Sequence, residues 1–230
     1  MRAYPPRWTV VTLIAVLVAG CSSAGNMQTE TSSQPPASAS TADLEALYWA
    51  RQDSARTSFT EADVRFMTGM IAHHAQALVM SRLAPTHGAS AQVQTLAARI
   101  INAQQDEIET MQRWLRRRGQ PVPEVHIEGL TLQVHGAGDH AMHMPGMLTE
   151  AQLQELDAAR GADFDRLFLT YMIEHHRGAV TMVDALFGTD GAAQDEATFR
   201  LAADINADQK TEIARMELML ERLPDPDQDS

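Results

Sequence analysis

The sequence contains a single cysteine, Cys21, and that scarcity restricts the kinds of site the chain can hold. A chain with one cysteine cannot form an internal disulfide, even in a compartment that would permit one. It also lacks the thiolates that zinc fingers, iron–sulfur clusters and blue-copper centres require. Any metal site in the folded part must therefore be built from histidine, methionine or carboxylate side chains.

Basic and aromatic residues are also scarce. The chain has 18 lysines and arginines against 30 acidic residues, a formal net charge of -12, which argues against binding to nucleic acid. Aromatic residues make up only 5% of the chain, and from residue 41 onward Ala, Leu, Gln, Glu and Arg dominate over β-branched residues. This composition favours helix. We expect a helical domain with no nucleic-acid partner.

The first 20 residues have the pattern of an export signal. Two arginines precede an apolar stretch from 8 to 19, which is too short for a comfortable membrane span. Residues 17–21, Leu-Val-Ala-Gly-Cys, resemble the lipobox of bacterial lipoproteins. We expect a signal peptide over 1–20, lipidation of Cys21 and attachment to a lipid membrane, facing the periplasm or the cell exterior. An ordinary signal peptide with an incidental cysteine is the alternative.

Beyond the signal, the chain divides into a tether and one folded domain. Residues 21–40 are rich in Ser, Thr, Ala, Gln and Pro, which is typical of a flexible tether. Within a domain over 41–222, apolar periodicity and helix start and stop signals predict a set of helices. They cover about 41–55, 60–83, 90–117, 162–187 and 195–222, with a short helix opened by a Thr149–Gln152 capping box. Residues 118–148 are predicted to form a long loop.

The long helices form an internal repeat. The segment 66–80 recurs at 168–182, offset by 102, and the segment 100–111 recurs at 205–216, offset by 105. The three extra residues fall in the turn at 188–197, where a surface loop can absorb them. Two helix hairpins that each have one apolar face should pack together. The sequence therefore predicts an all-α four-helix bundle.

Each repeat carries a His-His pair between two methionines on its inner face. At ~100° per residue, Met70, His73, His74 and Met80 fall on one arc about 140° wide. The second repeat has the equivalent set: Met172, His175, His176 and Met182. Packing alone would accept leucine at the methionine positions, yet both copies keep them while neighbouring residues differ. We therefore favour a metal site over the alternative, a purely structural stripe.

The second helix of each repeat supplies further candidates. Met111 and Met216 lie on the stripes that face the histidines, and we include both as candidate ligands. Gln104 and Gln209 lie on the same stripes. Because a buried imidazole needs partners for its ring nitrogens, we expect either glutamine to orient a ring by accepting its second N–H.

The predicted loop holds a second cluster of possible ligands. Seven of them fall within 13 residues: His135, Asp139, His140, Met142, His143, Met144 and Met147. An ordinary flexible connection rarely concentrates three methionines. We expect a metal-binding loop with His140, Met142, His143, Met144 and Met147 as its ligands, and an ordinary connection is the alternative.

The chemistry of these side chains selects the metal. Thioether and imidazole without thiolate suit Cu(I) and Ag(I), and imidazole can also hold Cu(II). Zinc prefers histidine with cysteine or carboxylate, and calcium and magnesium prefer oxygen ligands. Carboxylate-bridged di-iron bundles place a glutamate three residues before each histidine, whereas positions 70, 71, 172 and 173 are methionine or isoleucine. We expect copper as the bound ion, with silver as a mimic.

Four segments of this chain carry a resemblance to a known family. They are Met70-x-x-His73-His74-x-x-Ala77-x-x-Met80, the run from Gln104 to Leu115, the Met-Pro-Gly-Met-Leu segment at 144–148, and 161–169 before the second His-His helix. With these segments the sequence resembles, over about 60–222, the domain-of-unknown-function family 305, an exported bacterial family grouped with ferritin-like four-helix proteins. Some members resemble periplasmic copper-binding proteins used in copper tolerance. The resemblance implies a copper role for the two His-His pairs and their methionine neighbours.

Three functions are compatible with these patterns. The first is a lipid-anchored copper-binding protein that sequesters copper or delivers it to a copper-handling partner protein. The second is a metal-dependent redox enzyme, but no acid–base pair facing a substrate can be isolated, so we expect no enzymatic activity. The third is a structural or partner-binding bundle in which histidine and methionine only fill the core.

Overall fold

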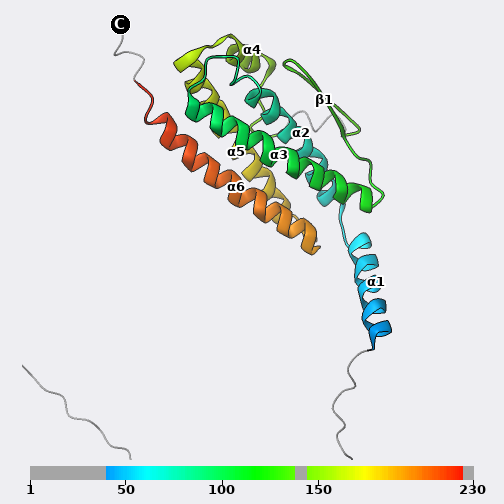
Figure 1. Cartoon of the computed structure of the whole chain (residues 1–230). Helices are drawn as coiled ribbons and strands as arrows, with labels where there is room; N and C mark the ends of the chain where they lie inside the picture. Colours follow the sequence, from blue (N-terminus) through cyan, green and yellow to red (C-terminus); the bar gives the residue numbers. More distant parts are fainter. Residues whose placement is uncertain (1–39, 138–143, 225–230) are drawn as a thin grey trace, which may run out of the picture. The chain divides into compact units, whose positions relative to one another are not determined.

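The computed structural model describes residues 40–137 and 144–224 of the chain. Within these ranges lie six helices and one two-stranded sheet (Figure 1). The predicted signal peptide, its Cys21 and most of the tether lie outside the described residues. So do four members of the predicted loop cluster: Asp139, His140, Met142 and His143.

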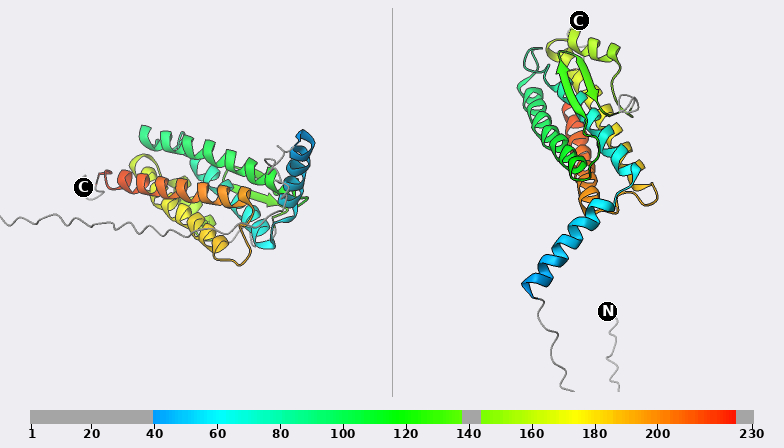
Figure 2. Two further views of the ribbon diagram at one scale, coloured as in Figure 1. Left: turned by 90° about the horizontal axis from the view of Figure 1, so that it is seen from below. Right: turned by 90° about the vertical axis from the view of Figure 1, so that its right-hand side faces the viewer.

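Four long helices form the bundle, and the all-α prediction is confirmed. They are α2 (Glu61–Ser81), α3 (Ala91–Arg117), α5 (Gly161–Phe187) and α6 (Glu196–Leu220). Helix α2 packs on α3 and α5 packs on α6, as two repeated helix hairpins should. The two helix hairpins contact each other through α2 and α5. Helices α3 and α6 lie next to each other on one face of the bundle (Figures 1 and 2).

Side-chain caps begin the helices where the sequence predicts. Thr60 and Asp63 form a capping box at α2, with Asp63 Oδ2 accepting from the Thr60 amide at 2.7 Å. Thr149 and Gln152 form the predicted capping box at α4 (Glu150–Ala158). These side chains satisfy backbone N–H groups that the first turn of a helix leaves without an internal partner.

A β-hairpin occupies residues 124–135, and the prediction of a loop there was wrong. Strand β1 (Glu124–Glu128) pairs antiparallel with β2 (Thr131–His135), with Ile127 opposite Leu132. Apolar and polar residues alternate along both strands, which is the period of a half-buried strand. The apolar face packs against α2, so that this helix is buried continuously from Phe66 to Ser81.

The first helix of the described chain has a different character. Helix α1 (Thr41–Thr57) carries Leu44, Leu47, Tyr48 and Trp49 with half or more of each side chain exposed. Of the helices described here, none combines the length and the apolar character needed to cross a membrane.

Candidate metal centre

The structure brings the two His-His pairs together in the core of the bundle. His73 and His74 of α2 and His175 and His176 of α5 are fully buried, each with 0% of its surface exposed. The rings of His73 and His175 lie against each other, with their centroids 3.8 Å apart and their planes at 35°. Because α2 and α5 are the helices through which the repeats meet, four imidazoles converge where the two halves join.

Three of the four rings have a fixed orientation. The Nε2–H groups of His74 and His176 donate to the carboxylates of Glu107 and Glu212, at 2.6 and 2.7 Å. His73 Nε2 donates to the backbone carbonyl of Pro145 at 3.0 Å. A ring that donates through Nε2 carries its lone pair on Nδ1.

The opposite ring nitrogens have no hydrogen-bond partner among the described residues. They are Nδ1 of His73, His74 and His176 and both nitrogens of His175. A buried polar atom without a partner costs free energy, and in a native core such an atom needs an explanation. Lone pairs that point into a closed core can be satisfied by a metal ion, which makes these nitrogens candidate ligands.

Burial keeps the stacked pair neutral. It lowers the pKa of His73 to about 3, the neighbouring His74 ring adds to the effect, and the hydrogen bond to Pro145 opposes it. Burial also lowers the pKa of His175 well below its ordinary value, with the His73 ring as the next cause. An imidazole must be neutral to bind a metal ion, so both rings have the required protonation state.

The candidate methionines of the helices are divided between two clusters of the hydrophobic core. One core cluster contains Met70 and Met111 of the first repeat with Met182 of the second. The other contains Met172 and Met216 of the second repeat with Met80 of the first. Each cluster therefore combines methionines from both repeats.

The expectation that glutamines orient the rings was wrong. Gln104 and Gln209 are buried, but Oε1 of each has no hydrogen-bond partner among the described residues. The orienting groups are Glu107 and Glu212, which lie one turn further along the same helices. The repeat already signalled them, because the two glutamates occupy equivalent positions in α3 and α6.

The segment 145–148 is held against helices α2 and α5. The side-chain amide of Gln76 makes two hydrogen bonds to the backbone of Leu148, at 2.9 and 2.7 Å. Where this segment touches α5, the helix has a glycine, Gly178. A Cβ at that position would lie 1.9 Å from the Pro145 carbonyl oxygen. The close approach brings that carbonyl within reach of His73.

The two described methionines of the predicted loop set have different surroundings. Met144 packs on Gly69 of α2, where a Cβ would lie 2.4 Å from Met144 Cε and 3.5 Å from Met182 Cε. Both methionines line a cavity of about 710 Å³ with Gln76 and Leu132. Met144 also packs against the core cluster that contains Met70 and Met182.

Carboxylate and imidazole alone do not make a site here. Within residues 40–137 and 144–224, no three His, Cys, Asp or Glu side chains converge into a group that could hold a metal ion.

Two solved structures of DUF305 proteins are similar to this chain in both sequence and fold. A DUF305 fragment from Deinococcus radiodurans is 32% identical, with a TM-score of 0.59, and the match covers 72% of this chain and 99% of that one. A candidate secreted DUF305 protein from Streptomyces coelicolor is 29% identical, with a TM-score of 0.58 and coverage of 70% and 93%.

A third similar structure holds a metal. CopM in its Cu(II)-bound form is 29% identical, with a TM-score of 0.53, and the match covers 69% of this chain and 95% of CopM. CopM has also been solved with Cu(I) and with Ag bound. No curated protein matched the chain. The family model for the domain of unknown function DUF305 matches residues 63–220, which include both His-His helices, and the chain belongs to that family.

Proposed function

We propose that this protein is an exported copper-binding protein that holds Cu(I), with Ag(I) as a mimic, in the core between α2 and α5. The observation that carries the proposal is the group of buried imidazole nitrogens with no hydrogen-bond partner among the described residues, in a bundle whose core also holds the candidate methionines. Imidazole and thioether together favour Cu(I) and Ag(I) over harder ions.

The proposed core ligands come equally from both repeats. They are Met70, His73, His74, Met80, Met111, Met172, His175, His176, Met182 and Met216. Glu107 and Glu212 hold two of the rings by their Nε2–H groups, the arrangement that fixes the tautomer of a metal-binding imidazole and raises its basicity. CopM supports the choice of metal, since its structures contain Cu(I), Cu(II) and Ag.

The same proposal includes the loop and the N-terminus. His140, Met142, His143, Met144 and Met147 would form a second, outer copper site that the ion itself orders. Cys21 would carry the lipid that holds the protein on a membrane, with the bundle free to sequester copper or pass it to a partner protein. Fatty-acid labelling of cells should mark the native chain and spare Cys21→Ala, and equal labelling of both would contradict the lipid anchor.

A Cu(I) titration against a competing chelator tests the core site. The variant with all four core histidines replaced by glutamine should lose the core copper, while His87→Gln should keep it. His87 is a matched control, because it is also buried but bonds to Asp157 outside the cluster. If the quadruple variant fails to fold, the double variant His74→Gln/His176→Gln leaves the stacked pair in place and should still lower affinity. Unchanged copper binding by a folded variant would show that the histidines are core packing.

A further inference from the structure

Cavities between α3 and α6 form a groove on the surface of the bundle. One of them, of about 330 Å³, has a lining that includes Glu107, Asp208 and Glu212. The side chains of Glu107 and Glu212 are 15% and 21% exposed, yet their carboxylates bond the fully buried rings of His74 and His176. Each glutamate therefore touches the groove at one end and an imidazole of the cluster at the other.

Unpartnered amide groups line the same cavity. Gln104 is 1% exposed and Gln209 is 2% exposed, and both belong to the cavity wall. Both amide atoms of Gln104 and Oε1 of Gln209 lack a hydrogen-bond partner in the described part of the chain. Amide and carboxylate oxygens so placed can replace water around a cation.

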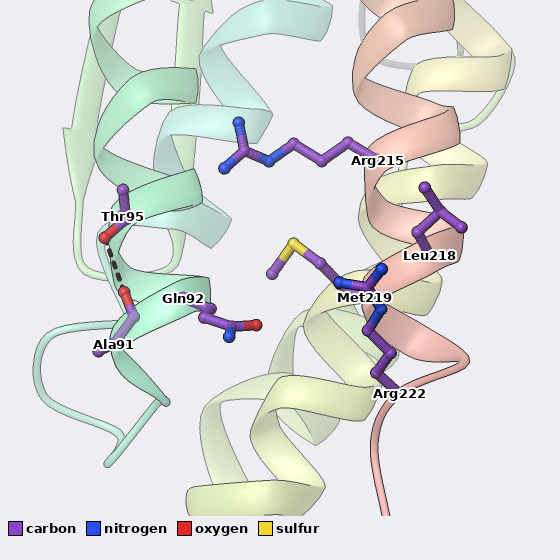
Figure 3. A pocket seen from close by; sticks show the side chains of 7 residues that line it. All are labelled: Ala91, Gln92, Thr95, Arg215, Leu218, Met219 and Arg222. Carbon is purple, nitrogen blue, oxygen red and sulfur yellow. Dashed lines mark hydrogen bonds between the residues drawn. The ribbon is translucent and has the colours of Figure 1, made fainter.

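Charge is unevenly distributed along the groove. Burial raises the pKa of Asp208, and the carboxylates of Glu107, Glu212 and Asp204 raise it further, so these acids share one field. Arg99 and Arg215 also line this cavity, and Arg215 lines a second cavity of about 510 Å³ as well. Figure 3 shows Arg215 in that second cavity, extending from α6 toward α3. A cation would thus be attracted to the acidic part and repelled at the arginines.

The far end of the groove is held shut. Arg118, the C-cap of α3, pairs with Asp195 at the start of α6, at 2.6 Å, and Trp114 Nε1 donates to Thr198 Oγ1 at 2.9 Å. These buried contacts tie the C-terminal end of α3 to the N-terminal end of α6. The acidic cavity lies between this closed end and the second cavity.

We propose that this groove is the entrance through which a copper ion reaches the core, with Glu107 and Glu212 receiving the ion and the oxygens of Gln104 and Gln209 replacing its water. The inference rests on the proposed copper function of the histidine cluster. Carboxylate and amide oxygens bind Cu(I) less well than imidazole and thioether do, so an ion held in the groove moves inward.

The rate of loading tests the entrance separately from the site. The mature chain is mixed rapidly with cationic Cu(I)–acetonitrile, free copper is removed by excess anionic chelator at set times, and bound copper is measured. Asp208→Asn should slow loading about threefold at low ionic strength, and Arg215→Gln should speed it by a similar factor. Both effects should shrink in high salt, where the Debye length falls to about 3 Å at 1 M.

Glu109→Gln is the matched control for charge. It removes the same single negative charge as Asp208→Asn, but Glu109 faces a different cavity, beside β1, and should leave the rate unchanged. A native chain that holds no copper even at saturation would overturn the proposed function itself. Copper retained at saturation with equal rates in the native chain, Asp208→Asn and Arg215→Gln would overturn the entrance and leave the site standing.

Discussion

The imidazole of His73 lies against that of His175, with ring centroids 3.8 Å apart, although the two residues belong to different repeats. Within the described part of the chain neither ring has an acidic partner, in contrast to His74 and His176, which bond glutamates. The four histidines are thus two kinds of residue: a central neutral pair and an outer pair oriented by carboxylates. Predictions for the two kinds differ.

The stability of the metal-free domain should fall in mild acid. His73 and His175 stay neutral when folded, because burial lowers their pKa values, that of His73 to about 3. An unfolded imidazole gains a proton below about pH 6.5, so the unfolded chain binds more protons than the folded one between about 6.5 and 3. The contribution of the two neutral rings to the free energy of unfolding is complete above pH 6.5. Below that pH it decreases by about 1.4 kcal/mol for each ring and each pH unit.

Urea unfolding at pH 7 and pH 5 measures the effect. The midpoint of the native domain should be lower at pH 5, and most of that difference should disappear in His73→Leu/His175→Leu. A native domain with the same midpoint at both pH values would show that the two rings are not held neutral.

Replacing the orienting carboxylates should weaken copper binding without unfolding the protein. Glu107→Gln/Glu212→Gln keeps the shape of both side chains but removes the charge that each ring N–H faces. We expect Cu(I) affinity to fall about tenfold or more. Glu217→Gln is the control, because Glu217 pairs with Arg177 at the surface. Equal affinity in both variants would rule out an orienting role.

The methionines should matter for their sulfur rather than for their bulk. Met70→Leu/Met182→Leu should cost less than about 1.5 kcal/mol per site in stability, because the volumes are similar. Cu(I) affinity should nevertheless fall about tenfold. Met67→Leu is the control: Met67 is fully buried in the same cluster, and the second repeat has Leu169 at the equivalent position. A loss of affinity in Met67→Leu as large as in the double variant would contradict the assignment.

A side chain at position 178 should displace the Pro145 segment. A Cβ there would lie 1.9 Å from the Pro145 carbonyl oxygen, so Gly178→Ala must separate that backbone from α5 and break its bond to His73. We expect a destabilisation of about 1–3 kcal/mol in urea unfolding. Gly188→Ala, at the end of the same helix with an ordinary φ of -80°, should cost less. Similar losses at both positions would contradict a specific contact.

The sequence contained most of the fold because the repeat and the helix signals agree with each other. Offsets of 102 and 105 place two equivalent hairpins in one bundle, and the Thr149–Gln152 box begins α4 as predicted. The hairpin at 124–135 was missed although Val125, Ile127, Leu132 and Val134 alternate with polar residues. The histidines and methionines that favour a loop lie mainly at 135–147, beyond most of this segment, whose period of two is that of a strand.

The candidate site was predicted only in part. Helical spacing identifies which faces hold His73 and His175, but it cannot show that the two rings meet, since that depends on how α2 crosses α5. The identity of the orienting residue, Glu107 rather than Gln104, depends on which of two residues one turn apart on the same helix reaches the ring. The low pKa of His73 follows from burial, which a single sequence does not measure.

The contact between His73 and His175 also determines how many chains the centre needs. A chain with one helix hairpin would supply only one ring of the His73–His175 pair and only part of each methionine cluster. It would have to form a dimer to complete the centre. Duplication within one chain keeps the second half present at an effective concentration on the order of millimolar, whatever the concentration of the protein. The core can therefore assemble once per chain even when the protein itself is rare.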